Sequence, residues 1–149
     1  MIAVIQRVKN ASVSIEGKLK GKCEQGLMIL LGVAKGDDES DARLLCAKIA
    51  KLRIFCDENG KMNLSVKDID GEALIVSQFT LLANYKKGNR PDYFAAGSPE
   101  HANYLYEYFV SLMREEVKHV DTGEFGADMQ VRILNDGPVT IVMDSNQLK

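Results

Sequence analysis

Hydrophobic and polar residues alternate over residues 2–8 and 11–15, which predicts two strands that each bury one face. Residues 26–33 are apolar at almost every position, so we expect a strand at the centre of a sheet, where both faces are covered. The remaining strand-like segments are residues 19–23, 73–79, 128–134 and 139–143. The chain is therefore predicted to be rich in strands.

Two segments have the start signals of helices. Residues 39–52 begin among acidic residues, whose charge is favourable at the positive end of a helix dipole. In the second segment, Ser98 is the expected N-cap and Pro99 the first helical residue. Its apolar stripe is predicted to be Tyr104, Leu105, Tyr108, Phe109, Leu112 and Met113. An Asn59-Gly60 turn predicts a hairpin between the helices, and the whole pattern indicates an α/β fold.

Length, charge and hydropathy limit the classes of protein that fit. A chain of 149 residues predicts a single domain over residues 1–149. Its net charge of −2 argues against a protein that coats nucleic acid, but not against one that grips only an RNA end. We find no signal-peptide pattern and no apolar run near the ~20 residues of a membrane span, and expect a cytoplasmic protein. Cys23, Cys46 and Cys56 lack C-x-x-C spacing, which predicts buried free thiols.

The usual acid–base and metal-binding groups are sparse. His101 and His119 are the only histidines, and we expect both on a solvated face rather than in a Ser-His-Asp triad. Cysteines and histidines are too scattered for a zinc site, so no metal and no cofactor is expected. Gly32 and Gly36 match a phosphate loop only loosely, because the Lys and Ser/Thr that should follow are missing.

Two polar segments offer chemistry of another kind. Residues 76–81 (Val-Ser-Gln-Phe-Thr-Leu) end an apolar strand with two hydroxyls, an amide and an aromatic ring. Residues 135–140 (Asn-Asp-Gly-Pro-Val-Thr) place a rigid Gly-Pro dipeptide between two strand-like runs. On spacing alone, the first segment also fits simple strand alternation and the second a tight hairpin turn. Catalysis by these segments would have to rely on backbone groups and on the substrate itself.

A basic cluster of Lys86, Lys87 and Arg90 directly follows the first of these segments. Such a cluster is ordinarily a solvated surface, but beside a binding site it could hold a phosphate group. Both interpretations stay open at the level of the sequence.

Five separated motifs resemble those of D-aminoacyl-tRNA deacylases, in order and over essentially the whole chain. They are Gln6-Arg7, residues 26–33, Lys61-Met62-Asn63-Leu64-Ser65, residues 76–81 and residues 135–140. The resemblance implies a barrel-like α/β fold with two main helices, and a homodimer without a metal whose active site lies at the subunit interface. It also implies hydrolysis of the ester that joins a D-amino acid to the 3′-terminal adenosine of tRNA.

The same resemblance implies roles for individual residues. Gly137 and Pro138, joined by a cis bond, would reach into the partner subunit's pocket and exclude L-aminoacyl groups. Arg7 would orient this dipeptide, with Phe125 and Met129 as further supporting residues. The implied catalytic set is Ser77, Gln78, Phe79 and Thr80. A wall that only excludes an L substituent should also admit glycyl-tRNA, which has no Cβ.

Several alternatives remain open. Backbone N–H groups around Phe79 and Thr80 could form an oxyanion hole. Thr80 is either a nucleophile or a residue that positions groups around a water assisted by the tRNA ribose hydroxyl, and the absence of an adjacent base favours water. Phe79 and Phe125 fit a pocket for adenosine and core packing equally well. Two other classes fit the same residues: a hydrolase that uses Ser77 or Thr80 covalently on a small ester or amide, and a non-catalytic dimer that binds RNA ends or nucleotides.

Overall fold

A computed structural model describes residues 1–149, which form eight strands, two α-helices and two 3-10 helices. The strands are β1 (Ile2–Ile15), β2 (Lys18–Cys23), β3 (Gly26–Gly32), β4 (Phe55–Cys56), β5 (Met62–Leu64), β6 (Glu72–Ser77), β7 (Val120–Thr122) and β8 (Gln130–Asp144). The helices are α1 (Glu39–Ala50), η1 (Phe79–Leu82), α2 (Pro99–Glu116) and η2 (Ser145–Leu148). No helix has both the length and the apolar character needed to cross a membrane.

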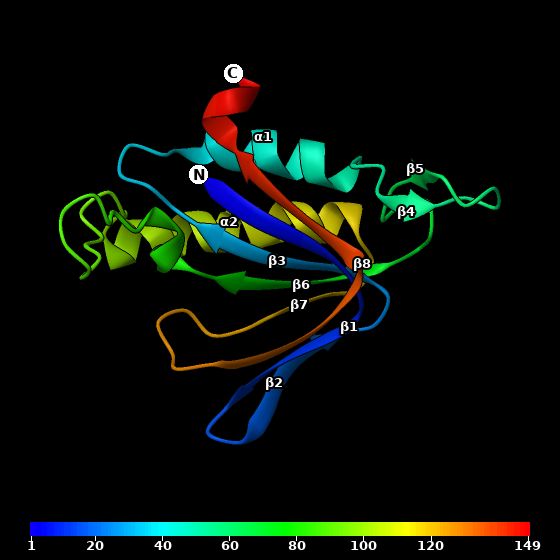
Figure 1. Cartoon of the computed structure of the whole chain (residues 1–149), viewed down its shortest axis with the longest axis horizontal. Helices are drawn as coiled ribbons and strands as arrows, with labels where there is room; N and C mark the ends of the chain where they lie inside the picture. The colour runs from blue at the N-terminus through cyan, green and yellow to red at the C-terminus, as the bar shows by residue number, and fades with distance from the viewer.

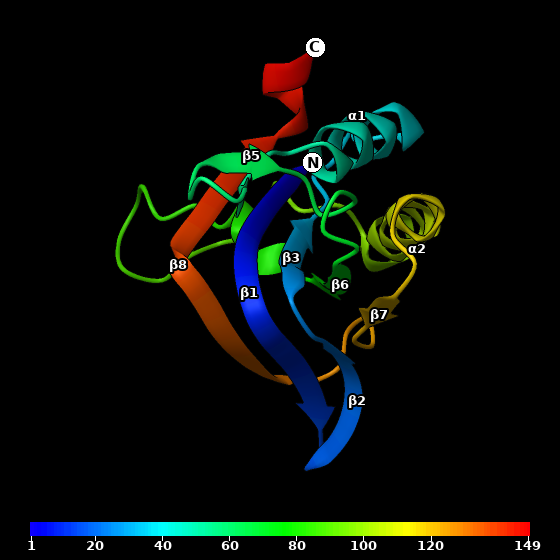
Figure 2. The same ribbon diagram turned by 90° about the vertical axis from the view of Figure 1, so that its right-hand side faces the viewer.

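One strongly curved sheet organises the molecule. Its strands follow the order β2-β1-β3-β6-β7, and β8 pairs with β1 outside that path. The helices α1 and α2 pack together beside this sheet, as the two views in Figures 1 and 2 show. The prediction of an α/β fold with a barrel-like sheet and two main helices is confirmed, and the apolar segment 26–33 lies at the sheet centre as β3.

The long strand β1 explains the curvature. Its first half, residues 2–8, pairs with β3, and its second half, residues 11–15, pairs with β2. β8 follows nearly the whole opposite edge of β1, from Ile2 to Ser14. The two predicted strands at 2–8 and 11–15 are therefore one strand that changes partners along its length.

The same pairing corrects the prediction for residues 128–143. Residues 130–144 form one strand, β8, instead of two strands joined by a hairpin turn. Both halves of β8 pair with β1, so the chain does not reverse direction at residues 135–140. Alternating hydrophobicity on both sides of a Gly-Pro dipeptide fits either arrangement, and only the shared partner strand distinguishes them.

Two apolar clusters stabilise the fold. The larger one joins the sheet to both helices, and the smaller one lies around Val13, Met28 and Leu74. Burial raises the pKa of the Cys23 thiol to about 12 and that of Cys46 to about 11. Cys56 is exposed, so the prediction of buried thiols holds for two of the three cysteines.

Helix α2 begins where the sequence predicts, because the Ser98 hydroxyl accepts a hydrogen bond from the His101 N–H at 3.3 Å and Pro99 is its first residue. The predicted apolar stripe is wrong in one place. Tyr104 is 56% exposed, whereas Tyr106 is buried against the sheet. Helix α1 ends at Ala50, two residues before the predicted end.

Candidate active site

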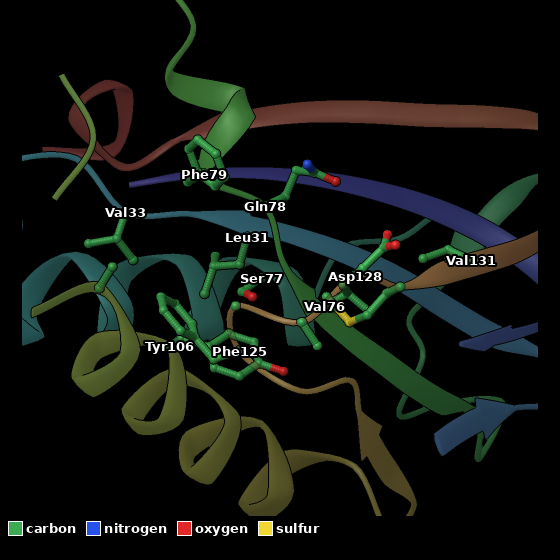
Figure 3. A pocket seen from close by; sticks show the side chains of 14 residues that line it. Leu31, Val33, Val76, Ser77, Gln78, Phe79, Tyr106, Phe125, Asp128 and Val131 are labelled. Carbon is green, nitrogen blue, oxygen red and sulfur yellow. The ribbon is translucent and has the colours of Figure 1, made fainter. Parts of the chain in front are cut away.

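A cavity of about 260 Å³ lies between the end of β6, helix α2 and the segment that precedes β8 (Figure 3). Ten of its fourteen lining residues are hydrophobic. The lining residues are Leu31, Val33, Val76, Ser77, Gln78, Phe79, Ala102, Tyr106, Phe125, Gly126, Ala127, Asp128, Met129 and Val131. A mainly apolar concave site with a few polar groups is typical of small-ligand pockets in proteins.

The polar end of the cavity is built where β6 stops. Ser77 pairs with Leu31 of the parallel strand β3, and the Gln78 N–H continues this ladder to the Leu31 carbonyl at 2.8 Å. The chain then turns into η1, which packs on β3 at Gly32. A Cβ on Gly32 would lie 2.8 Å from Leu82 and 3.0 Å from the Gln78 carbonyl, so glycine permits this close approach.

The 3-10 helix η1 corrects the prediction that the strand continues to residue 79. Phe79 and Thr80 occupy the first two positions of η1. The first N–H groups of a helical turn have no partner within it, so these two are available to an outside acceptor. Phe79 lines the cavity, whereas Thr80 is exposed beside it and its hydroxyl accepts a hydrogen bond from the Gln78 side-chain amide.

The opposite wall is formed by aromatic and thioether side chains. Tyr106 and Phe125 have ring centroids 6.2 Å apart, and Met129 approaches them across Gly123, where a Cβ would lie 2.6 Å from its sulfur. The Tyr106 hydroxyl donates to the Ile75 carbonyl at 2.7 Å, and burial raises its pKa to about 12. Tyr106 therefore stays neutral and serves as a fixed wall.

Asp128 is the single charged residue among those that line the cavity (Figure 3). Sequence reasoning missed both Asp128 and Tyr106. The signal for Tyr106 was present, because it is four residues after Ala102 and three before Phe109, which are both buried on the same helix face. Asp128 gave no local signal, because it lies in a loop that only the fold brings to β6.

Gly137 and Pro138 lie elsewhere, in an irregular part of β8. Gln6 is opposite Thr140 and Val8 opposite Asn135, so residues 136–139 face the single residue Arg7. We call residues 136–139 the Gly-Pro bulge. Its Gly137-Pro138 peptide bond is cis, both residues are exposed, and neither lines the cavity of its own chain. Gly137 has φ of +139°, a conformation that L side chains rarely adopt.

The base of the Gly-Pro bulge is held by polar side chains. Arg7 donates to the Asp136 carbonyl at 2.9 Å and to the Ile54 carbonyl at 2.8 Å. Asn135 accepts from the Val139 N–H at 2.9 Å and donates to the Thr140 hydroxyl at 2.9 Å. The bulge is thus a supported projection from the sheet.

The other groups that drew attention in the sequence lie apart from the cavity wall. His101 contacts the Asp37 carbonyl through Nε2 at 2.8 Å, and His119 lies 3.8 Å from carboxylate oxygens of Glu72 and Asp121. No three His, Cys, Asp or Glu side chains are grouped so that they could hold a metal ion.

A family model described as D-Tyr-tRNA(Tyr) deacylase matches residues 4–144. The chain belongs to this family. Relatives named D-aminoacyl-tRNA deacylase include one from Thermosipho africanus, 57% identical, with 99% of each chain covered. A second, from Sulfurihydrogenibium sp., is 57% identical over 99% of this chain and 100% of its own.

Solved structures resemble this deacylase family member over almost its full length. One titled "c-Myc DNA Unwinding Element Binding Protein" has a TM-score of 0.92 and 41% identity, covering 97% of this chain and 98% of its own. One titled "Structural Analysis of a probable eukaryotic D-amino acid tRNA deacylase" has a TM-score of 0.82, covering 96% and 98% of the two chains. The second is only 15% identical and supports the fold alone.

The structure sorts the expected deacylase residues into two groups. Ser77, Gln78, Phe79, Phe125 and Met129 meet at the cavity, with Thr80 on the adjoining turn. Gly137, Pro138 and Arg7 form a separate group at the Gly-Pro bulge. One copy of the chain therefore does not bring all the expected residues together.

Proposed function

We propose that this deacylase hydrolyses the ester between a D-amino acid and the 3′-terminal adenosine of tRNA, releasing both. The observation that carries the proposal is the pairing of an apolar cavity with the start of η1, where Phe79 and Thr80 have N–H groups without helical partners. The family match supports the reaction class. The site offers N–H donors but no strong base. An aminoacyl ester is already activated, so its hydrolysis needs charge stabilisation more than a strong base.

The cavity is the proposed pocket for the terminal adenosine. Phe125 and Met129 provide an apolar wall, and a base that stacks on an aromatic ring gains roughly 1–3 kcal/mol. A bound adenosine would place its ribose toward Ser77 and the start of η1. This arrangement assigns Phe125 and Met129 to substrate binding rather than to the core, and it agrees with their half-buried state.

Hydrolysis proceeds by water in this proposal. The N–H groups of Phe79 and Thr80 stabilise the oxyanion, a contribution of roughly 3–4 kcal/mol for a donor in other hydrolases. The neighbouring ribose hydroxyl assists the water, and Thr80 positions the groups around it. The Thr80 hydroxyl has an amide, Gln78, as its neighbour instead of a base, which makes it a weak nucleophile.

A second copy of the chain supplies the missing group. β8 pairs with β1 along one edge only, and it exposes apolar side chains on both sides of the Gly-Pro bulge, with Leu134 52% and Val142 67% exposed. A long exposed apolar edge strand is unusual in a monomer. A symmetric homodimer would cover this strand and place each bulge in the partner's cavity.

The bulge explains the selection of chirality in this scheme. Its backbone carbonyls would bind the α-amino group and leave no space for a Cβ in the L position. Selection is by exclusion, so any D side chain is accepted and glycyl-tRNA is hydrolysed as well. The chain acts as one domain over residues 1–149, in the cytoplasm, without a cofactor.

The shared site can be tested with purified heterodimers that carry two different tags. The cavity variant carries Gln78→Ala and Phe79→Ala, which lie at the end of β6 beside the cavity. The bulge variant carries Gly137→Ala and Pro138→Ala. A heterodimer of the two should have about half of the wild-type activity, because one cavity and the opposite bulge remain intact.

The control places all four substitutions in one subunit beside a wild-type subunit. That heterodimer should be inactive, because each site contains one damaged half. The reverse result, with the control half-active and the first heterodimer inactive, would show that each chain builds its own site.

A further inference from the structure

The segment at residues 84–94, which we call the basic loop, concentrates positive charge on a chain whose net charge is −2. Lys86, Lys87 and Arg90 are all exposed, and none forms an ion pair with a carboxylate of the chain. The single acidic residue of the loop, Asp92, accepts hydrogen bonds from the Asn84 amide at 3.4 Å and the Phe94 N–H at 3.3 Å. The side chains of Lys86, Lys87 and Arg90 are therefore available to bind an anionic ligand.

Two aromatic rings lie beside these cations. Tyr85 is 76% exposed and Phe94 is 77% exposed, the largest fractions among the exposed large hydrophobic residues. Exposed aromatic rings beside Lys and Arg side chains are the usual composition of surfaces that bind single-stranded nucleic acid, because bases stack on the rings and cations contact the phosphates. Neither ring contributes to the apolar clusters of this chain.

The basic loop has a defined shape. Asn84 and Asp92 exchange two backbone hydrogen bonds of 2.8 and 2.9 Å, which close the loop at its base. The Asn84 side chain also accepts from the Lys86 N–H at 3.2 Å. A surface that is fixed before binding loses less conformational entropy when a ligand arrives.

The C-terminal side of the loop, including Gly97 just beyond it, is attached to the cavity wall. Tyr93 packs edge-on against Phe79, with ring centroids 5.0 Å apart, and Gly97 donates to the Val33 carbonyl at 2.9 Å. Phe79 and Val33 both line the cavity. In Figure 1 this green segment projects from the molecule beside the start of α2. The basic loop therefore lies next to the cavity.

We propose that the basic loop binds the unpaired nucleotides immediately upstream of the aminoacylated adenosine. Lys86, Lys87 and Arg90 contact their phosphates, and Tyr85 and Phe94 stack on their bases. This inference rests on the proposed function, since it assumes that the terminal adenosine occupies the cavity. It assigns the affinity for the RNA chain to the loop and the chemistry to η1.

A binding experiment tests the loop without relying on catalysis. The probes are a labelled RNA hairpin with a four-nucleotide unpaired 3′ tail and the same hairpin with a blunt end, measured by fluorescence anisotropy. Wild-type protein should prefer the tailed hairpin, and the variant K86A/K87A/R90A should lose that preference. The logarithmic salt slope for the tailed hairpin should become shallower by about 2, because three phosphate contacts to a single strand are lost.

The matched control is K48A/K51A/K61A, which removes three exposed lysines that form no ion pair and lie away from the loop. It lowers the net charge equally and should leave both the preference and the slope unchanged. A second variant, Y85A/F94A, should weaken binding of the tailed hairpin at least about fivefold and leave the salt slope unchanged. Equal losses in the control variant would show general electrostatics and overturn the proposal.

Hydrolysis separates this inference from the proposed function. K86A/K87A/R90A should lower kcat/KM for D-tyrosyl-tRNA at least about tenfold, yet leave D-tyrosyl-adenosine hydrolysis within about twofold of wild type. Equal losses on both substrates, or dissociation of the variant into monomers by sedimentation velocity, would show a structural or subunit-contact role and overturn it. Wild-type protein that cleaves neither substrate would contradict the proposed function alone. The anisotropy experiment would still show whether the basic loop binds the unpaired RNA tail.

Discussion

The Arg7 Nε group donates a hydrogen bond of 2.9 Å to the carbonyl of Asp136, the residue directly before Gly137. The same guanidinium binds the Ile54 carbonyl at 2.8 Å, and the side chain is only 11% exposed. Arg7 therefore links the start of the Gly-Pro bulge to the segment before β4. This link makes the position of the bulge depend on a residue that does not line the cavity.

Arg7→Lys should reduce deacylation of D-tyrosyl-tRNA at least about tenfold, because one ammonium cannot reproduce the two directed bonds of a guanidinium. The free energy of unfolding should fall by about 1–3 kcal/mol, the usual effect of losing a hydrogen bond to a charged group. Arg53→Lys is the matched control, since Arg53 also donates to a backbone carbonyl, that of Asn63, at 2.9 Å. Equal activity losses in both variants would contradict a specific role for Arg7.

Gly137→Ala should abolish most of the activity. Its added Cβ would lie 2.9 Å from the Val139 nitrogen and 3.0 Å from the Arg7 guanidinium, at a φ of +139°, so the bulge must move. Gly60→Ala controls for backbone strain alone, because Gly60 also has a positive φ of +75° and open space around it. Steady-state deacylation and urea unfolding of both variants check the expectation. Full activity in Gly137→Ala would remove the bulge from the site.

Thr80→Ala should retain deacylation within about tenfold of wild type, because the proposed nucleophile is water and the backbone N–H groups remain. The measurement is single-turnover hydrolysis of D-tyrosyl-tRNA. Complete loss of activity, together with an acyl-enzyme trapped in wild-type protein by acid quench and mass spectrometry, would establish Thr80 as the nucleophile instead.

Asp41 should make the stability depend on pH at the acid end. Burial opposes its ionisation, but hydrogen bonds from the Asp38 N–H at 2.9 Å, the Ser145 hydroxyl at 2.7 Å and Lys149 at 3.0 Å lower its pKa to about 2. A folded-state pKa below the ordinary value of 3.8 contributes stability above pH ~4 that is lost as the pH falls toward 2. The contribution is about 2 kcal/mol.

Urea unfolding at pH 7, 4 and 2 checks this dependence on wild type and Asp41→Asn. The stability difference between the two proteins should shrink as the pH falls below about 4, because the unfolded wild-type carboxyl then binds a proton while the folded one, with a pKa of about 2, stays ionised. A difference that stays constant down to pH 2 would contradict the lowered pKa.

The parts of the fold that depend on local signals could be predicted from the sequence. Continuous apolar residues at 26–33 indicate a central strand, and Ser98-Pro99 marks the start of α2. The site depends on longer-range pairing. Whether residues 135–140 turn the chain or bulge from a strand is decided by β1, more than a hundred residues earlier. Asp128 reaches the cavity only because the loop before β8 folds across the end of β6.

The separation of Phe79 from Gly137 within one chain was implied by the family resemblance, which places Gly137 in the partner subunit's pocket. The hydrophobic and polar pattern alone does not say whether one chain brings the two segments together. In the structure, Phe79 lines the cavity while the bulge projects elsewhere. This separation supports the proposed homodimer, in which each bulge would enter the partner's cavity.

The most direct test of the account compares the rates at which D-tyrosyl-, L-tyrosyl- and glycyl-tRNA are deacylated by the same wild-type preparation, with L-alanyl-tRNA as the reference for a small L side chain. Selection by exclusion predicts rapid loss of D-tyrosyl-tRNA, measurable hydrolysis of glycyl-tRNA, and L-substrates at least roughly a hundredfold slower than D-tyrosyl-tRNA. Hydrolysis of glycyl-tRNA no faster than that of L-alanyl-tRNA would contradict selection by exclusion, and equal rates for D- and L-tyrosyl-tRNA would contradict the proposed function itself.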